Sequence, residues 1–153
     1  PLAATAASTE ATEMFRRHTR YFNTWASSPV QAAAGNAVLD GIEQANLHEN
    51  ATTVGKFLHE RFLQIQAKHK SVGDVRGHGL FRGLEFVTDL KSKAPDKQSA
   101  VRVVNELKDR GFLTGNAGAY NNVLKVRPPL VFSIIDAEEF LGALEQTLEH
   151  LDA

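Results

Sequence analysis

Two groups of side chains in this sequence could bind an anion, and the first precedes a predicted helix. Asn23, Thr24, Ser27 and Ser28 come immediately before Pro29, a residue that suits the first position of a helix. The unpaired N–H groups and the dipole at a helix N-terminus both attract negative charge, which suits a phosphate. The same side chains could simply cap the helix, so capping and anion binding are both open interpretations.

The second group lies on a predicted strand near the C-terminus. Lys125 and Arg127 are two residues apart in the run 123–127, which ends at Pro128 and Pro129. Because side chains of a strand alternate between its faces, both cations should lie on one face. Such a pair could bind a carboxylate or a phosphate, or it could be a solvated edge.

Other chemistry finds little support in the residue types and their spacing. The six histidines are scattered, so we expect no metal site. The glycines around 77–83 precede a predicted strand and not a helix, which argues against a dinucleotide site. The chain has no cysteine, which excludes a cysteine nucleophile and a disulfide framework.

The hydrophobic pattern predicts the elements that must position these groups. The predicted helices cover 9–17, 29–45, 47–69, 97–110 and 134–151, and the predicted strands cover 72–76, 80–87, 112–114 and 123–127. This order predicts an α+β fold, in which helices pack on a small, mostly antiparallel sheet, preceded by an N-terminal segment and a long connecting helix.

Local signals set the expected ends of these elements. We expect Ser8 or Thr9, Asn46 with Glu49, and Ser133 with Asp136 to cap helix starts, and Gly111 to end a helix. A glycine inside a strand, Gly83, predicts a bulge or a close approach of backbone. The apolar stripe of the helix 29–45 consists mostly of small residues, so we expect a neighbour to pack closely against it.

Composition narrows the partners and the compartment. The formal net charge is −1 and no block of like charges occurs, so we expect no nucleic acid and no membrane surface as partner. No apolar run is long enough to span a membrane. The absence of cysteine fits a cytoplasmic protein. Since the sequence begins with Pro1, we expect that it was processed or cut from a longer chain.

Several segments, in order, resemble one known family. The run 21–30 (YFNTWASSPV) is similar to F-x-T-F-G-G-N-P of the class-III pyridoxal-phosphate (PLP)-dependent aminotransferases, and the run 73–85 resembles their V-R-G-x-G-L-x-x-G-x-E. The run 122–133 resembles their substrate-side strand and last helix cap. Pro1–Ala4 resembles the piece that follows their cofactor lysine. The branch most similar is the alanine–glyoxylate aminotransferase-2-like one, which includes phospholyases acting on phosphorylated amino alcohols.

This resemblance implies an architecture and a cofactor. Residues 1–28 would be the end of the large cofactor-binding domain with a cross-subunit loop, and residues 29–153 the C-terminal small domain of a PLP transferase with its connecting helix. The Schiff-base lysine would lie upstream of Pro1, so the chain would hold no catalytic residue and be inactive alone, with PLP absent or weakly bound. The implied partners are the rest of the enzyme chain, a second copy in a homodimer, and a small amino or oxo acid.

The resemblance also implies roles for four residues. Thr24 matches a threonine that hydrogen-bonds the phosphate of the partner subunit's PLP, with Asn23 beside it. Lys125 aligns with an arginine that binds the substrate carboxylate, and Arg127 is a second candidate for that role. A lysine is a point charge and not a bidentate fork, so a phosphate-bearing substrate would suit it.

Two departures keep alternatives open. Ala26, Ser27 and Ser28 replace the usual Gly-Gly-Asn, and Trp25 replaces the usual phenylalanine. The altered loop leaves room for a non-catalytic dimerisation or interaction module. A phospholyase of phosphorylated amino alcohols is the alternative within the enzymes.

Overall fold

The structure is a computed structural model that describes residues 2–26 and 28–152. The chain forms two compact units, Pro1–Ala45 and Asn46–Ala153. The boundary predicted after residue 28 separates two domains of a longer chain and not these two units, so it stays a prediction. In the part of the chain that the structure describes, no helix is long and apolar enough to cross a membrane.

The first unit consists of two helices and the loop between them. Helix α1 (Thr9–His18) begins at Ser8, whose hydroxyl accepts a hydrogen bond of 3.3 Å from the backbone N–H of Ala11. This confirms one of the two predicted caps. Helix α2 (Pro29–Gln44) starts at the predicted proline and buries none of its described residues. The expected packing of its small-residue stripe on a neighbour stays a prediction.

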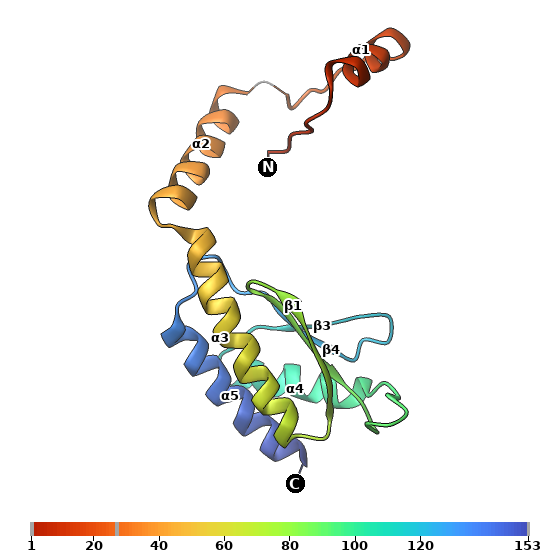
Figure 1. The fold of residues 1–153 in the computed structure, drawn as a ribbon, viewed down its shortest axis with the longest axis vertical. Coiled ribbons are helices and arrows are strands. Elements are labelled where there is room, and N and C mark those ends of the chain that lie inside the picture. The colour runs from red at the N-terminus through yellow and green to blue at the C-terminus, as the bar shows by residue number, and fades with distance from the viewer. Residues whose placement is uncertain (1, 27, 153) are drawn as a thin grey trace. The chain divides into compact units, whose positions relative to one another are not determined.

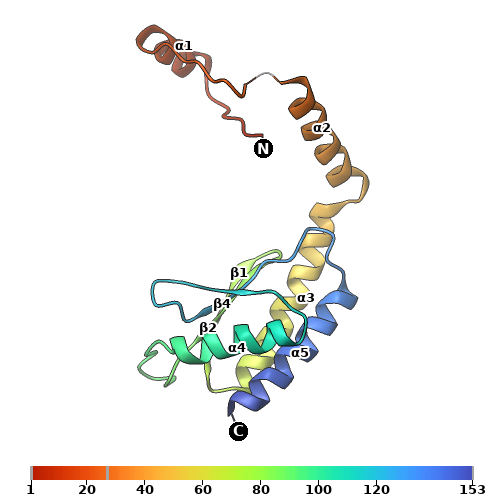
Figure 2. The ribbon, with the colours of Figure 1, turned by 180° about the vertical axis from the view of Figure 1, so that it is seen from behind.

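The second unit is an α+β fold, as the sequence predicts (Figure 1). Its helices are α3 (Leu47–Lys68), α4 (Lys97–Asp109) and α5 (Ile134–Asp152), and its strands are β1 (Val72–His78), β2 (Phe81–Phe86), β3 (Gly115–Ala117) and β4 (Val123–Val126). The strands form one antiparallel sheet in the order β1-β2-β4-β3. Helices α3 and α4 contact the sheet, and α5 packs on both of them (Figure 2).

Burial alternates along β2 because helices cover one face of the sheet. In β2, Arg82, Leu84 and Phe86 are buried, whereas the residues between them are only partly buried. The core joins the inward side chains of β1, β2 and β4 to the apolar faces of the three helices, with Phe62 against Phe140 at a ring-centroid distance of 6.4 Å. Burial of these side chains is the main stabilising contribution to the unit.

Helix ends follow the predicted signals with one exception. Gly111 has a φ of 95°, the left-handed conformation that ends α4. Ser133 and Asp136 form the predicted box at the start of α5, since each backbone N–H bonds the other side chain, at 2.8 and 3.2 Å. The predicted cap at Asn46 is wrong. Asn46 has a φ of 50° and makes no capping bond, because the chain turns there between α2 and α3.

The strand predictions need two corrections. The predicted strand 112–114 is not formed, and β3 lies instead at Gly115–Ala117, where the chain pairs with β4. In the β1–β2 pair the register shifts between Val72 and Asp74 and not at Gly83, so Gly83 carries no bulge. The close approach at Gly83 is to a side chain, since an added Cβ would lie 3.0 Å from Cγ1 of Val123.

Candidate functional site

Thr24 lies in a tight turn of the first unit. The turn is closed by a 3.2 Å bond from the N–H of Ala26 to the carbonyl of Asn23, and by a 2.9 Å bond from the N–H of Trp25 to Oδ1 of Asn23. Asn23 also donates from Nδ2 to the hydroxyl of Tyr21 at 3.2 Å. The side chain of Asn23 is therefore used to shape the turn. Among the described residues, the exposed Thr24 hydroxyl has no hydrogen-bond partner.

The start of α2 follows this turn. Ser28 has extended backbone angles, with φ −78° and ψ 121°, but its side chain makes no capping hydrogen bond. The side chain of Ser28 therefore does not cap α2. Ser27, which belongs to the same predicted group, lies outside the described residues.

Lys125 and Arg127 line an open cavity of about 410 Å³ in the second unit. Its walls come from the segment before β3, from β4, from the loop that joins β4 to α5, and from Phe140 of α5. The loop contributes Pro128, Pro129 and Phe132. The cavity thus combines a proline and aromatic wall with two cations, an arrangement typical of small-molecule sites.

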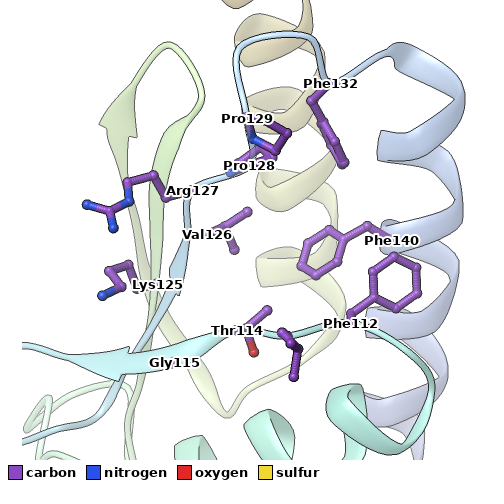
Figure 3. A pocket seen from close by; sticks show the side chains of 11 residues that line it. Phe112, Thr114, Gly115, Lys125, Val126, Arg127, Pro128, Pro129, Phe132 and Phe140 are labelled. Carbon is purple, nitrogen blue, oxygen red and sulfur yellow. The ribbon is translucent and has the colours of Figure 1, made fainter. Parts of the chain in front are cut away.

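The two cations project to the same side of the chain, as the alternation of a strand predicts. Figure 3 shows Lys125 and Arg127 on one side of β4, and the rings of Phe112, Phe132 and Phe140 on the side of α5. Lys125 is half-buried and Arg127 is exposed. Within the described ranges 2–26 and 28–152, neither cation has a hydrogen bond or an ion pair. Both charges are therefore available to an anionic ligand.

A row of paired residues crosses the sheet at Lys125. Arg76 pairs with Gly83, and Gly83 pairs with Lys125, so the three residues share the face opposite the helices. Arg76 forms ion pairs with Asp74, at 2.7 Å, and with Glu85. Its hydrogen bond to Asp74, and to a smaller extent that to Glu85, raises the pKa of Arg76 above the ordinary value. Its charge is therefore balanced locally, in contrast to that of Lys125.

A second cavity, of about 370 Å³, lies on this face of the sheet. Gly83 and Arg76 both line it. Lys125 lines this cavity as well as the first one. Lys125 is therefore a wall residue shared by the two cavities.

Two side chains that frame the site were not singled out from the sequence. Arg82 is buried and donates to three backbone carbonyls, those of Gly55 and Gly77 at 2.8 Å and that of Gly79 at 2.9 Å. Burial lowers its pKa. Asn50 of α3 donates to two carbonyls of the loop after β4. Their partners are far away in sequence, so no local pattern could have indicated these contacts.

Comparison with known proteins identifies the family of this chain. The family model described as "Aminotransferase class-III" matches residues 1–148. This chain belongs to the class-III aminotransferases. The family is PLP-dependent, and its small-domain fold agrees with the α+β unit described above.

Three relatives illustrate the match. Alanine–glyoxylate aminotransferase 2 homolog 2, mitochondrial, from Arabidopsis thaliana is 37% identical over 151 residues, which are 99% of this chain and 31% of that protein. A phospholyase from Arthrobacter in complex with phosphoethanolamine is 38% identical with a TM-score of 0.89, over 93% of this chain and 34% of that one. A PLP-bound amine transaminase from an uncultivated Pseudomonas species is 29% identical with a TM-score of 0.79, over 89% of this chain and 31% of that one.

This class-III aminotransferase chain therefore spans about a third of the length of its relatives. Its described residues fit one part of the cofactor, the phosphate, for which the free hydroxyl of Thr24 and the start of α2 are suitable partners. Asn23 would act there through the turn that it closes. Lys125 and Arg127, in the other unit, carry charge that suits an anionic ligand.

Proposed function

We propose that this chain is the C-terminal part of a PLP-dependent aminotransferase, which transfers an amino group between an amine or amino acid and an oxo acid. The single observation that carries the proposal is the family match over residues 1–148 in a chain about a third as long as its relatives. When bound, PLP would supply the group that accepts the amino nitrogen and draws electrons from the substrate. The residues of this chain would bind and orient the substrate and the phosphate of the cofactor.

Lys125 and Arg127 are proposed to bind the anionic end of the substrate. Neither cation is neutralised by a described residue, and both line the same cavity of about 410 Å³. A carboxylate or phosphate held there would fix the orientation of a small substrate, and correct orientation lowers the entropic part of the barrier. The rings of Phe132 and Phe140 would keep water from the apolar side of the ligand.

Thr24 is proposed to donate its hydroxyl hydrogen to the phosphate of PLP held by a second copy of the chain, and Asn23 to support it. This assignment requires a homodimer and the remaining part of the enzyme as partners. The Thr24 hydroxyl, which has no partner among the described residues, and the start of α2, which Ser28 does not cap, support it, because both leave donors free for an anion.

A phospholyase reaction on a phosphorylated amino alcohol is the second candidate. It is favoured by the similarity to the Arthrobacter phospholyase in complex with phosphoethanolamine, and by the pair of unpaired cations. A phosphate carries more charge than a carboxylate, so two cations that include a lysine suit it well.

The test uses the full-length protein encoded by the gene, with PLP, and the 153-residue chain alone. Transfer from alanine to glyoxylate would establish the aminotransferase, and phosphate release from phosphoethanolamine would establish the phospholyase. The chain alone should show no turnover beyond that of free PLP, because we place the Schiff-base lysine upstream of Pro1. A reading frame that adds no large domain would instead favour a non-catalytic dimerisation module.

The cytoplasm is the proposed compartment. The Arabidopsis relative is named as mitochondrial, so the mitochondrion is the alternative compartment. Fractionation of cells that express the full-length protein from its own gene would decide between the two. Recovery with a mitochondrial marker would overturn the cytoplasmic proposal.

A further inference from the structure

The loop between β4 and α5 forms one wall of the cation-lined cavity. Arg127, Pro128, Pro129 and Phe132 all lie on this loop, and all four line the cavity. Paired strand hydrogen bonding ends at Val126, and α5 begins at Ile134. The residues between these points therefore depend on other contacts for a fixed position.

One side chain outside the loop supplies such contacts. Asn50, in the first turn of α3, donates from Nδ2 to the carbonyl oxygen of Leu130 at 2.7 Å and to that of Phe132 at 3.0 Å. An amide nitrogen carries two hydrogens, so both donors are used. The partners lie 80 and 82 residues further along the chain, so the bonds hold two distant parts of the unit together.

Two features restrict the loop between this contact and Arg127. A 3.0 Å bond from the N–H of Phe132 to the carbonyl of Pro129 closes a turn within the loop. Pro128 and Pro129 have φ angles fixed by their rings, which removes much of the freedom between Leu130 and Arg127. At the other end, Ser133 and Asp136 fix the entry into α5. A shift at Leu130 should therefore move Arg127 as well.

We propose that Asn50 is a positioning residue of the substrate cavity. By holding the carbonyls of Leu130 and Phe132, it keeps Arg127 and the ring of Phe132 in place around the ligand. That Asn50 holds the loop does not depend on which reaction the enzyme catalyses. That it affects substrate binding rests on the proposed function. The experiment therefore has a structural part and a kinetic part.

The most informative variant is Asn50→Asp in the full-length protein. It keeps the shape of the side chain, but an ionised carboxylate has no hydrogen to donate to the two carbonyls. An acidic residue is favourable in the first turn of a helix, so α3 should stay folded. Asn50→Ala is the second variant, which removes both donors without adding charge, and Asn50→Gln restores an amide donor.

Thr52→Ala is the matched control. Thr52 is exposed two residues further along α3, and its hydroxyl donates to the carbonyl of His48, at 2.9 Å, which is its one partner among the described residues. Removal of this hydroxyl perturbs α3 without touching the loop. Any effect shared by Thr52→Ala and the Asn50 variants would therefore reflect the helix and not the two hydrogen bonds of Asn50 to the loop.

The structural part measures amide hydrogen exchange of residues 131–133. We expect exchange about tenfold faster in Asn50→Asp and Asn50→Ala, unchanged exchange in Thr52→Ala, and partial recovery in Asn50→Gln, because loss of these hydrogen bonds favours local opening. Unchanged exchange in both Asp and Ala variants would overturn the proposal whatever the reaction of the enzyme.

The kinetic part measures KM and kcat for the substrate that the wild-type enzyme turns over. We expect KM to rise about tenfold, the equivalent of 1.4 kcal/mol, with kcat changed less than about twofold, since uniform binding is lost. Faster exchange with an unchanged KM would overturn the positioning role. If the wild-type protein has neither transfer nor elimination activity, the proposed function fails, and the exchange result alone decides whether Asn50 holds the loop.

Discussion

Arg82 donates a 2.8 Å hydrogen bond from Nη2 to the carbonyl oxygen of Gly55, which lies 27 residues earlier, in α3. The same guanidinium donates to the carbonyls of Gly77, in β1, and of Gly79, in the turn between β1 and β2. This buried cation, which has no carboxylate partner among residues 2–26 and 28–152, thus fixes the hairpin to α3. Arg82 pairs with Val126 of β4, so the strand held by this contact is the neighbour of the strand that carries Lys125.

Gly55→Ala is predicted to lower the free energy of unfolding by about 3 kcal/mol, since overpacking and a lost hydrogen bond act together. An added Cβ would lie 2.7 Å from Cα of Gly79, which is backbone and can yield only if the hairpin moves. Urea unfolding followed by circular dichroism measures this change.

Gly142→Ala is the control for that substitution. An added Cβ at Gly142, within α5, meets nothing within 4 Å. Alanine is favoured over glycine in a helix, so we expect stability to rise by about 0.5–1 kcal/mol. Equal effects of the two substitutions would contradict the proposed packing at Gly55.

Stability should depend on pH through the box at the start of α5. The hydrogen bond from the backbone N–H of Ser133, and to a smaller extent that from its hydroxyl, lowers the pKa of Asp136. The folded pKa is thus below the unfolded one. The contribution of Asp136 is therefore present above the unfolded pKa and is lost as pH falls through the folded pKa.

The variant Asp136→Asn tests this dependence. It should be less stable than the wild type at pH 7, and the difference should shrink as the pH falls below the ordinary range of an aspartate. Unfolding free energies measured between pH 7 and pH 3 check the trend. A difference that stays constant over this interval would show that the charge of Asp136 is not involved.

Lys125→Gln and Arg127→Gln are each predicted to raise KM of the full-length enzyme about tenfold, because each removes a charge-assisted contact to the anionic substrate. Arg102→Gln is the control, since Arg102 is an exposed cation of α4 outside both cavities. Steady-state kinetics at fixed ionic strength measure the effect. If all three variants behave alike, the cavity does not bind the substrate.

Thr24→Val is predicted to weaken PLP binding by the full-length enzyme about tenfold, because valine keeps the shape of threonine without its hydroxyl. Equilibrium dialysis of the cofactor gives the dissociation constant. Thr19→Val, an exposed threonine just after α1, is the control. An unchanged PLP affinity in Thr24→Val would remove Thr24 from the cofactor site.

Elements with strong local signals were predicted well. Ser8, Pro29 and the Ser133–Asp136 pair define helix starts through contacts within four residues, so the sequence pattern contains the whole signal. The alternation of Lys125 and Arg127 likewise required only the period of a strand.

Features that depend on distant partners were missed. Phe112-Leu113-Thr114 has the higher strand propensity, yet Gly115–Ala117 pairs with β4, because pairing partners and not propensity decide where a short strand forms. The contacts of Asn50 and Arg82 span 80 and 27 residues and leave no periodic signal. The environment of the cavity therefore became visible only in the structure.

The most direct test of the central claim locates the lysine that binds PLP. The full-length protein would be incubated with PLP, reduced with borohydride, digested, and analysed by mass spectrometry for the peptide that carries the cofactor. We predict that this peptide lies upstream of Pro1 and that no lysine of residues 1–153 is modified. A cofactor bound to a lysine within residues 1–153, such as Lys125, would contradict the assignment of this chain as the non-catalytic C-terminal part of the enzyme.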